Sequence, residues 1–133
     1  MKKIIIVTIL LIFPLLSFAQ DSVTISNPEK SNVSKKVVWS QDCAMGYARI
    51  MSGLHKEAIP YLEKATQTNP NDAYAYSFLG IAYSSLGNYE EAIKHYEKAK
   101  ELFLEQEDYE QVKAIENDLE KVKQKEQLQN KKS

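Results

Sequence analysis

One cysteine and two histidines are the side chains in this sequence with the clearest capacity for catalysis or metal binding. A helix running from Cys43 to His55 would place them about 18 Å apart, at about 1.5 Å per residue, which is too far for a nucleophile and its base. His95 lies four residues after Glu91 on one predicted helix surface, and the sequence has no cluster of ligand types at zinc spacing. We therefore expect each of these residues to pack or to lie at the surface, with no metal site and no cofactor.

Other kinds of chemistry have equally little support. Carboxylates such as Glu90 fall at the spacing of helix-surface charge pairs, here with Lys94, and the sequence contains neither a glycine-rich phosphate loop nor a nucleophile elbow. The 17 basic and 18 acidic residues give a net charge of −1, which leaves no excess of Lys and Arg to neutralise nucleic-acid phosphates. A small enzyme is therefore the least favoured class of function.

The start of the sequence has the three parts of a secretory signal peptide. Two lysines follow Met1, residues 4–16 are predominantly apolar, and small residues precede a cut between Ala19 and Gln20. We predict a signal peptide over residues 1–19, with an uncleaved signal anchor as the alternative, and a flexible polar linker over residues 20–38. Both alternatives predict export, to the periplasm or out of the cell, with no other contact with the membrane.

The most informative feature is a repeat with a period of 34 residues. Residues 39–72 align with residues 73–106, so that Gly46 falls on Gly80. Small residues, large apolar residues and turn glycines match in order along both segments. The sequence therefore predicts two copies of one structural unit.

Each unit has the pattern of a helical hairpin. In residues 73–86, apolar side chains recur every three or four positions, which is typical of one face of a helix. Gly87 and Asn88 accept left-handed backbone conformations and are expected to end that helix, and a second helix is expected to begin at Tyr89. Asp72 is the expected cap of the first helix.

These hairpins resemble the tetratricopeptide repeat, and the chain is identified as a small exported bacterial-type member of that family. The family motif runs aromatic-x2-Leu-Gly-x2-Tyr, then Ala-x3-aromatic-x2-Ala, then Pro. The matching residues are Met45, Gly46, Ala58, Leu62, Ala65 and Pro70 in the first unit, and Tyr76, Leu79, Gly80, Tyr83, Ala92, Tyr96 and Ala99 in the second. Asp42, Arg49 and Leu104 depart from the motif, and the first two lead us to expect a partly exposed outer side on the first helix.

The rest of the sequence predicts a cap. From Tyr109 a long polar helix carries one narrow apolar stripe, as the last helix of a repeat stack requires. We assign residues 107–128 to this capping helix and residues 129–133 to a disordered tail, with a coiled-coil arm as the alternative to the cap. The predicted fold class is all-α, with two helix–turn–helix repeats in a short right-handed α-solenoid and a capping helix at its C-terminal end.

The resemblance implies a binding groove lined by the first helix of each unit, which in this family holds an extended peptide or a partner helix. The residues at groove positions are Cys43, Tyr47, Ile50, Tyr74, Ser77, Ile81 and Ser84. We therefore expect a non-enzymatic adaptor or scaffold of the cell envelope or secreted space, with another protein as its partner. Because two repeats bury little surface, a structural or oligomerisation subunit that pairs with a second copy is the alternative.

Overall fold

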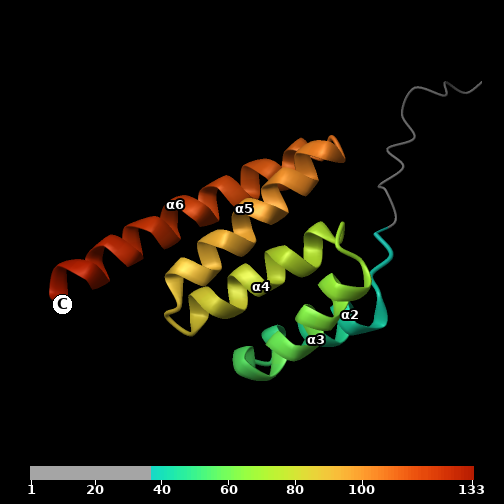
Figure 1. Ribbon diagram of the computed structural model, residues 1–133, viewed down its shortest axis with the longest axis horizontal. Helices are drawn as coiled ribbons and strands as arrows, with labels where there is room; N and C mark the ends of the chain where they lie inside the picture. The colour runs from blue at the N-terminus through green and yellow to red at the C-terminus, as the bar shows by residue number, and fades with distance from the viewer. Residues whose placement is uncertain (1–36) are drawn as a thin grey trace, which may run out of the picture. The chain divides into compact units, whose positions relative to one another are not determined.

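The computed structural model describes residues 37–133, so the predicted signal peptide, its cut between Ala19 and Gln20 and nearly all of the predicted linker lie outside the described residues. Within this range the regular secondary structure is helical throughout (Figure 1). The helices are α2 (Gln41–Met51), α3 (His55–Thr68), α4 (Ala73–Ser85), α5 (Tyr89–Glu105) and α6 (Tyr109–Lys132). The all-α fold class is confirmed.

The helices form two successive hairpins, α2 with α3 and α4 with α5, followed by α6, which lies along α5 (Figure 1). Each hairpin turn contains a glycine with left-handed backbone, with φ of 75° at Gly53 and 80° at Gly87. The second turn closes when the Asn88 N–H donates to the Tyr83 carbonyl over 2.9 Å. A residue with a Cβ adopts this conformation only at a cost, which explains why both turns use glycine.

Carboxylate caps begin α4 and α6. Asp72 Oδ1 accepts a hydrogen bond from the Ala75 N–H at 3.0 Å, which confirms the predicted cap of α4. Asp108 Oδ1 accepts from the Gln111 N–H at 3.3 Å and serves α6 in the same way. Each cap satisfies one of the N–H groups that the first turn of a helix leaves without an intrahelical partner.

Glycines set the closeness of the two helices within each hairpin. A Cβ on Gly80 of α4 would lie 2.7 Å from the Tyr96 ring of α5, and a Cβ on Gly46 of α2 would overlap the side chain of Leu62 in α3. The absent side chain therefore leaves the space into which the large side chain of the partner helix packs. Both glycines belong to the repeat motif, and the structure gives the same physical reason for each.

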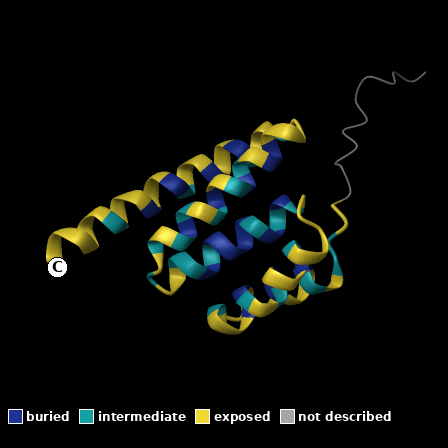
Figure 2. Ribbon diagram, in the orientation of Figure 1, coloured by how far each residue is buried: buried dark blue, intermediate teal, exposed yellow. Residues whose placement is uncertain are grey.

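The central helix, α4, is covered on two sides. Ala75, Phe78, Leu79 and Ala82 belong to the core shared with the first hairpin, whereas Ala73 belongs to the core shared with α5 and α6. Figure 2 shows α4 as mostly buried or half-buried. The sequence predicted one apolar face at three-and-four spacing, and coverage from both hairpins explains why burial extends further around the helix.

The last helix is amphipathic and longer than the sequence predicted. Val112, Ile115, Leu119 and Val122 are buried and belong to the core shared with α5, while the outer surface of α6 is exposed (Figure 2). The helix continues to Lys132, so the prediction of a disordered tail over residues 129–133 is corrected. Gln and Lys have high helix propensity, and a helix already nucleated by packing extends at low cost. None of the helices in residues 37–133 is both long enough and apolar enough to cross a membrane.

The two edges of the repeat stack differ. At the first edge, Ala44, Met45, Ala48 and Met51 of α2 are exposed, although the equivalent positions of α4, shifted by 34 residues, include the buried Phe78, Leu79 and Ala82. The first hairpin covers that face of α4, and nothing in residues 37–133 covers the same face of α2. At the other edge, α6 presents charged residues to solvent.

Replacing Gly80 with Ala is expected to lower the free energy of unfolding by about 1–3 kcal/mol, because the new methyl group would force the Tyr96 ring to move within a packed interface. Equilibrium urea unfolding measures the change. Ser85→Ala, on the exposed end of the same helix, is the matched control and is expected to change stability by less than about 0.5 kcal/mol. A Gly80→Ala protein as stable as the wild type would contradict the close approach.

Candidate functional site

An aromatic cluster lies where α2 meets α4. The ring centroid of Trp39 is 4.9 Å from that of Tyr47, 5.2 Å from that of Phe78 and 5.8 Å from that of Tyr74. Tyr74 in turn makes an edge-to-face contact with Phe103 of α5, at 5.0 Å. Edge-to-face and tilted ring pairs at these distances are attractive beyond their burial of apolar area. The cluster therefore joins both hairpins, and two of its rings, Tyr47 and Tyr74, stand at predicted groove positions.

Trp39 reaches this cluster from the segment that precedes α2. The next residue, Ser40, has extended backbone (φ −62°, ψ 159°), and its Oγ accepts a hydrogen bond from the Cys43 N–H at 3.1 Å. This cap fixes the point at which the chain enters the helix. Sequence reasoning missed the role of Trp39, because the repeat aligns it with Ala73 and a comparison of the two units gives no signal there.

The predicted groove residues divide into two sets. Tyr47, Tyr74, Ile81 and Ser84 are half-buried and remain candidates for contact with a partner; we call the surface that they form the α2–α4 face. Cys43, Ile50 and Ser77 are 0%, 9% and 9% exposed. These three contribute mainly to the core and present little or no surface to a partner, because the two hairpins pack closely at their positions.

Cys43 is a free, fully buried cysteine. Burial, together with the neighbouring carboxylate of Asp72, raises the pKa of its thiol to about 12. A thiol with this pKa is neutral at physiological pH and a poor nucleophile. Residues 37–133 also contain no group of three or more His, Cys, Asp and Glu side chains arranged to hold a metal ion.

Two negatively charged side chains act on Tyr74 in the α2–α4 face. Burial raises the pKa of the Tyr74 hydroxyl, and the carboxylates of Asp108 and Glu110, at the start of α6, raise it further. From Ala73 to Ser85, α4 itself carries no charged residue. Tyr74 therefore combines aromatic neighbours with two carboxylates that act on its hydroxyl, a feature that the sequence analysis did not identify.

The opposite side of the hairpins is occupied by packing contacts. His95 of α5 stacks on Tyr83 at 5.3 Å with an interplanar angle of 6°, and on Tyr76 at 6.2 Å. The Tyr83 hydroxyl lies 3.3 Å from Glu63 Oε1 and links the second hairpin to the first. His95 thus has the packing role that the sequence predicted.

In the first hairpin, charged residues replace those aromatic contacts. Asp42 forms an ion pair with Lys64 at 3.1 Å, and the Arg49 guanidinium lies 5.1 Å from the centroid of the Tyr61 ring. Both are half-buried, consistent with the expectation of a partly exposed outer side. The two departures from the repeat motif are therefore matched by suitable partners on α3.

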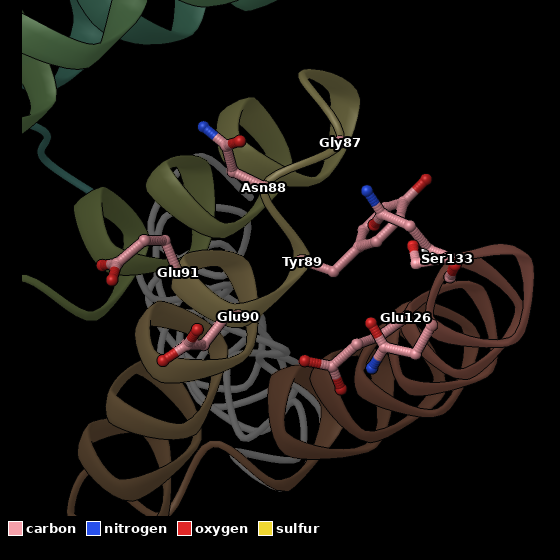
Figure 3. A pocket seen from close by; sticks show the side chains of 9 residues that line it. Gly87, Asn88, Tyr89, Glu90, Glu91, Glu126 and Ser133 are labelled. Atoms are coloured by element: carbon pink, nitrogen blue, oxygen red, sulfur yellow. Dashed lines mark hydrogen bonds between the residues drawn. The ribbon is translucent and has the colours of Figure 1, made fainter.

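A shallow polar depression of about 350 Å³ lies elsewhere, between the α4–α5 turn and the end of α6. Figure 3 shows Tyr89 reaching from the start of α5 toward Ser133, with Glu126 nearby. None of the residues of the α2–α4 face lines it. The depression is open and mostly polar, and it has none of the convergent apolar surface that characterises a small-molecule site.

Comparison with known families agrees with this geometry. Residues 43–72 and residues 73–105 each match the tetratricopeptide repeat family. Residues 43–105 match two consecutive tetratricopeptide repeats. The two matches correspond to the α2–α3 and α4–α5 hairpins, so α6 follows the second repeat and closes a short tetratricopeptide-repeat solenoid.

Two curated relatives match part of this chain. The chain is 43% identical over 56 residues to "Cellulose synthase operon protein C" of Escherichia coli (strain K12), covering 42% of this chain and 5% of that protein. It is 37% identical over 57 residues to "Superkiller complex protein 3" of Mus musculus, covering 43% of this chain and 4% of that protein. The chain therefore spans about one twentieth of the length of either relative, and each match covers less than half of this chain.

The repeats define the general class of activity. Tetratricopeptide repeats mediate protein–protein interactions and are generally not enzymatic. Among the described residues, α2 and α4 carry the half-buried aromatic side chains Tyr47 and Tyr74, which are compatible with this class. The match therefore suggests protein binding as the general class of activity.

The free energy of unfolding is expected to decrease as the pH is lowered, because His95 takes up a proton less readily in the folded protein than in the unfolded chain. Burial lowers the pKa of His95 below its ordinary value of 6.5, and the carboxylates of Glu91 and Glu63 only partly oppose this. Below pH 6.5 the unfolded chain binds the proton more readily than the folded chain, so the free energy of unfolding decreases as pH falls toward the pKa of the folded state. Replacing His95 with Gln removes this contribution.

Urea unfolding at about pH 7.5, 6.5 and 5.5 measures the effect, with the wild type and His95→Gln compared at each pH. The stability of the wild type is expected to decline more steeply below pH 6.5 than that of the variant. Identical slopes for the two proteins would show that the stacked imidazole titrates alike in the folded and unfolded chains.

Proposed function

We propose that this chain is a non-enzymatic adaptor that binds a peptide or helix of another protein on the α2–α4 face. The observation that carries the proposal is the aromatic cluster, in which Tyr47 and Tyr74 are half-buried and lie on the first helices of consecutive repeats. In this family those helices line the surface that receives a partner. The same two residues stand at the groove positions predicted from the sequence.

The physical properties of the face suit this role. Tyrosine offers a large apolar ring with a polar end, and a few such anchors usually dominate the binding energy of an interface. Tyr74 contacts Trp39, Phe78 and Phe103, so its position is set before a partner arrives. A preorganised anchor loses little conformational entropy on binding.

The charges around the face indicate which part of a partner it does not hold. Some tetratricopeptide domains clamp a C-terminal carboxylate with basic residues on these helices. Here α4 has no basic residue, and the carboxylates near Tyr74 would repel a terminal carboxylate. We infer that the partner is held through internal side chains.

We also propose that the adaptor acts in the cell envelope or the secreted space. Support comes from the sequence pattern of residues 1–19, in which two lysines, an apolar run and small residues before Gln20 follow the order of a signal peptide. A two-repeat solenoid exported in this way would meet its partner outside the cytoplasm.

Export predicts a defined N-terminus. Mass spectrometry of the protein recovered from the envelope or the medium is expected to show a chain that begins at Gln20, because the cut should follow Ala19. A protein that retains Met1 in the membrane fraction would support the signal-anchor alternative. Recovery of the intact protein from the cytoplasm would contradict export.

Binding on the α2–α4 face predicts that Tyr47→Ala and Tyr74→Ala each weaken association with the native partner by about tenfold or more, because each removes a central aromatic anchor. Crosslinking in the native cell followed by quantitative mass spectrometry measures partner recovery. Helical circular dichroism establishes that the variants remain folded.

Tyr109→Ala is the matched control, because Tyr109 is 67% exposed at the start of α6 and lies outside the α2–α4 face. This variant is expected to recover the partner as well as the wild type does. Unchanged recovery with Tyr47 and Tyr74 both replaced would eliminate the α2–α4 face as the binding surface.

A further inference from the structure

The α2–α4 face is already in contact with one segment of its own chain. Trp39 lies in the segment that precedes α2, and its indole contacts Tyr47, Phe78 and Tyr74. The two residues before it, Val37 and Val38, are 47% and 80% exposed. A short segment outside the repeats thus places one aromatic side chain against the face while its neighbours stay at the surface.

The contact made by Trp39 leaves one polar group unsatisfied. Its Nε1 is buried and finds no hydrogen-bond acceptor among residues 37–133. A buried N–H without an acceptor costs free energy that a hydrogen-bonded occupant would not lose. The indole is therefore held by ring packing without a hydrogen bond of its own, so its hold on the face is weaker than that of a hydrogen-bonded ring.

The sequence around Trp39 complements the charge near the face. Two basic residues, Lys35 and Lys36, immediately precede Val37, Val38 and Trp39 in the sequence. The carboxylates of Asp108 and Glu110 act on Tyr74, which is itself a neighbour of Trp39. A segment with positive charge next to an aromatic anchor would match both the apolar and the negative parts of this surface.

We propose that the α2–α4 face recognises an extended peptide segment in which basic residues precede a tryptophan-like aromatic anchor, and that Trp39 is its built-in occupant. A partner segment of the same chemistry binds by replacing Trp39 between Tyr47, Tyr74 and Phe78. This inference rests on the proposed function and specifies the partner that the face selects.

The test uses the occupant as a probe. A synthetic peptide of residues 34–40, Ser-Lys-Lys-Val-Val-Trp-Ser with blocked ends, is added to the full-length protein carrying Trp39→Ala. Because Trp39 is the only tryptophan of the chain, the indole of the peptide is then the only tryptophan present. Its fluorescence emission is expected to shift to shorter wavelength, with saturation, as the ring leaves water for the vacated site.

Thermal unfolding provides a second readout, because a ligand that binds only the folded state raises its melting temperature. The peptide is expected to raise the melting temperature of Trp39→Ala more than that of the wild type, whose site is filled. Trp39→Phe serves as a second host, since it retains a ring in the cluster and also lacks tryptophan. Where Trp39→Ala fails to fold, the same fluorescence shift is expected with Trp39→Phe at lower affinity.

Matched variants separate the anchor from the charge. A peptide with Ala in place of its Trp, followed by thermal shift and calorimetry, is expected to bind about tenfold or more weakly. A peptide with Glu in place of both Lys is expected to lose affinity to a similar degree. In the protein, Glu110→Gln is expected to weaken the basic peptide and to leave the Glu-substituted peptide unaffected or slightly favoured.

Two results would overturn the proposal. One is the absence of both a fluorescence shift and a thermal shift with either host, and the other is equal affinity for the basic and the Glu-substituted peptides. If the peptide fails while partner recovery still depends on Tyr47 and Tyr74, the adaptor function stands and the inferred specificity is wrong. If the peptide binds but those substitutions leave partner recovery unchanged, the proposed function is wrong.

Discussion

The close approach of two helices at a glycine is the constraint on which the rest of the structure depends. In each hairpin a large side chain, Leu62 or Tyr96, packs where a Cβ on Gly46 or Gly80 would otherwise stand. That contact sets the separation of the helices and therefore the width of the hairpin. Two hairpins built to one separation can stack, and the stacking brings α2 beside α4 and creates the aromatic surface between them.

The two hairpins solve the same packing problem with different chemistry on their outer sides. In the second, His95 lies against the rings of Tyr76 and Tyr83. In the first, the two corresponding tyrosine-type positions carry Asp42 and Arg49, which contact Lys64 and Tyr61. The shape of the backbone thus survives a change from stacked rings to charged contacts, because the glycine approach inside each hairpin is independent of its outer surface.

Local and periodic features of the fold could be predicted from the sequence. The cap at Asp72 depends on its immediate neighbours, and the glycines at hairpin turns depend on backbone conformation alone. The extension of α6 to Lys132 could not be predicted from apolar burial, because the last residues bury nothing and their helix propensity alone is sufficient. Whether a groove position is accessible depends on how tightly the second hairpin packs, so the burial of Ile50 and Ser77 could not be predicted from one helix at a time.

The candidate site was predicted where it follows the repeat and missed where it does not. Tyr47 and Tyr74 stand at repeated positions, whereas Trp39 belongs to the lead-in segment and has only Ala73 as its counterpart. The negative charge near Tyr74 was missed for a different reason, since Asp108 and Glu110 come from the helix after the repeats and reach Tyr74 only through tertiary packing. The position of Trp39 and the carboxylates near Tyr74 both depend on contacts between a repeat and its flanking segments. A comparison of one repeat with the other cannot reveal such contacts.

Among residues 37–133, one face of α2 is left uncovered, and it gives the solenoid a direction. Ala44, Met45, Ala48 and Met51 present the kind of surface that Phe78, Leu79 and Ala82 present to the preceding hairpin, whereas α6 ends the array with charged residues. The α2 end of the array exposes a surface on which another repeat could stack, whereas the α6 end presents charged residues instead. Any lengthening of this array, by duplication of a repeat or by docking of a foreign hairpin, would meet a compatible surface only on its amino-terminal side.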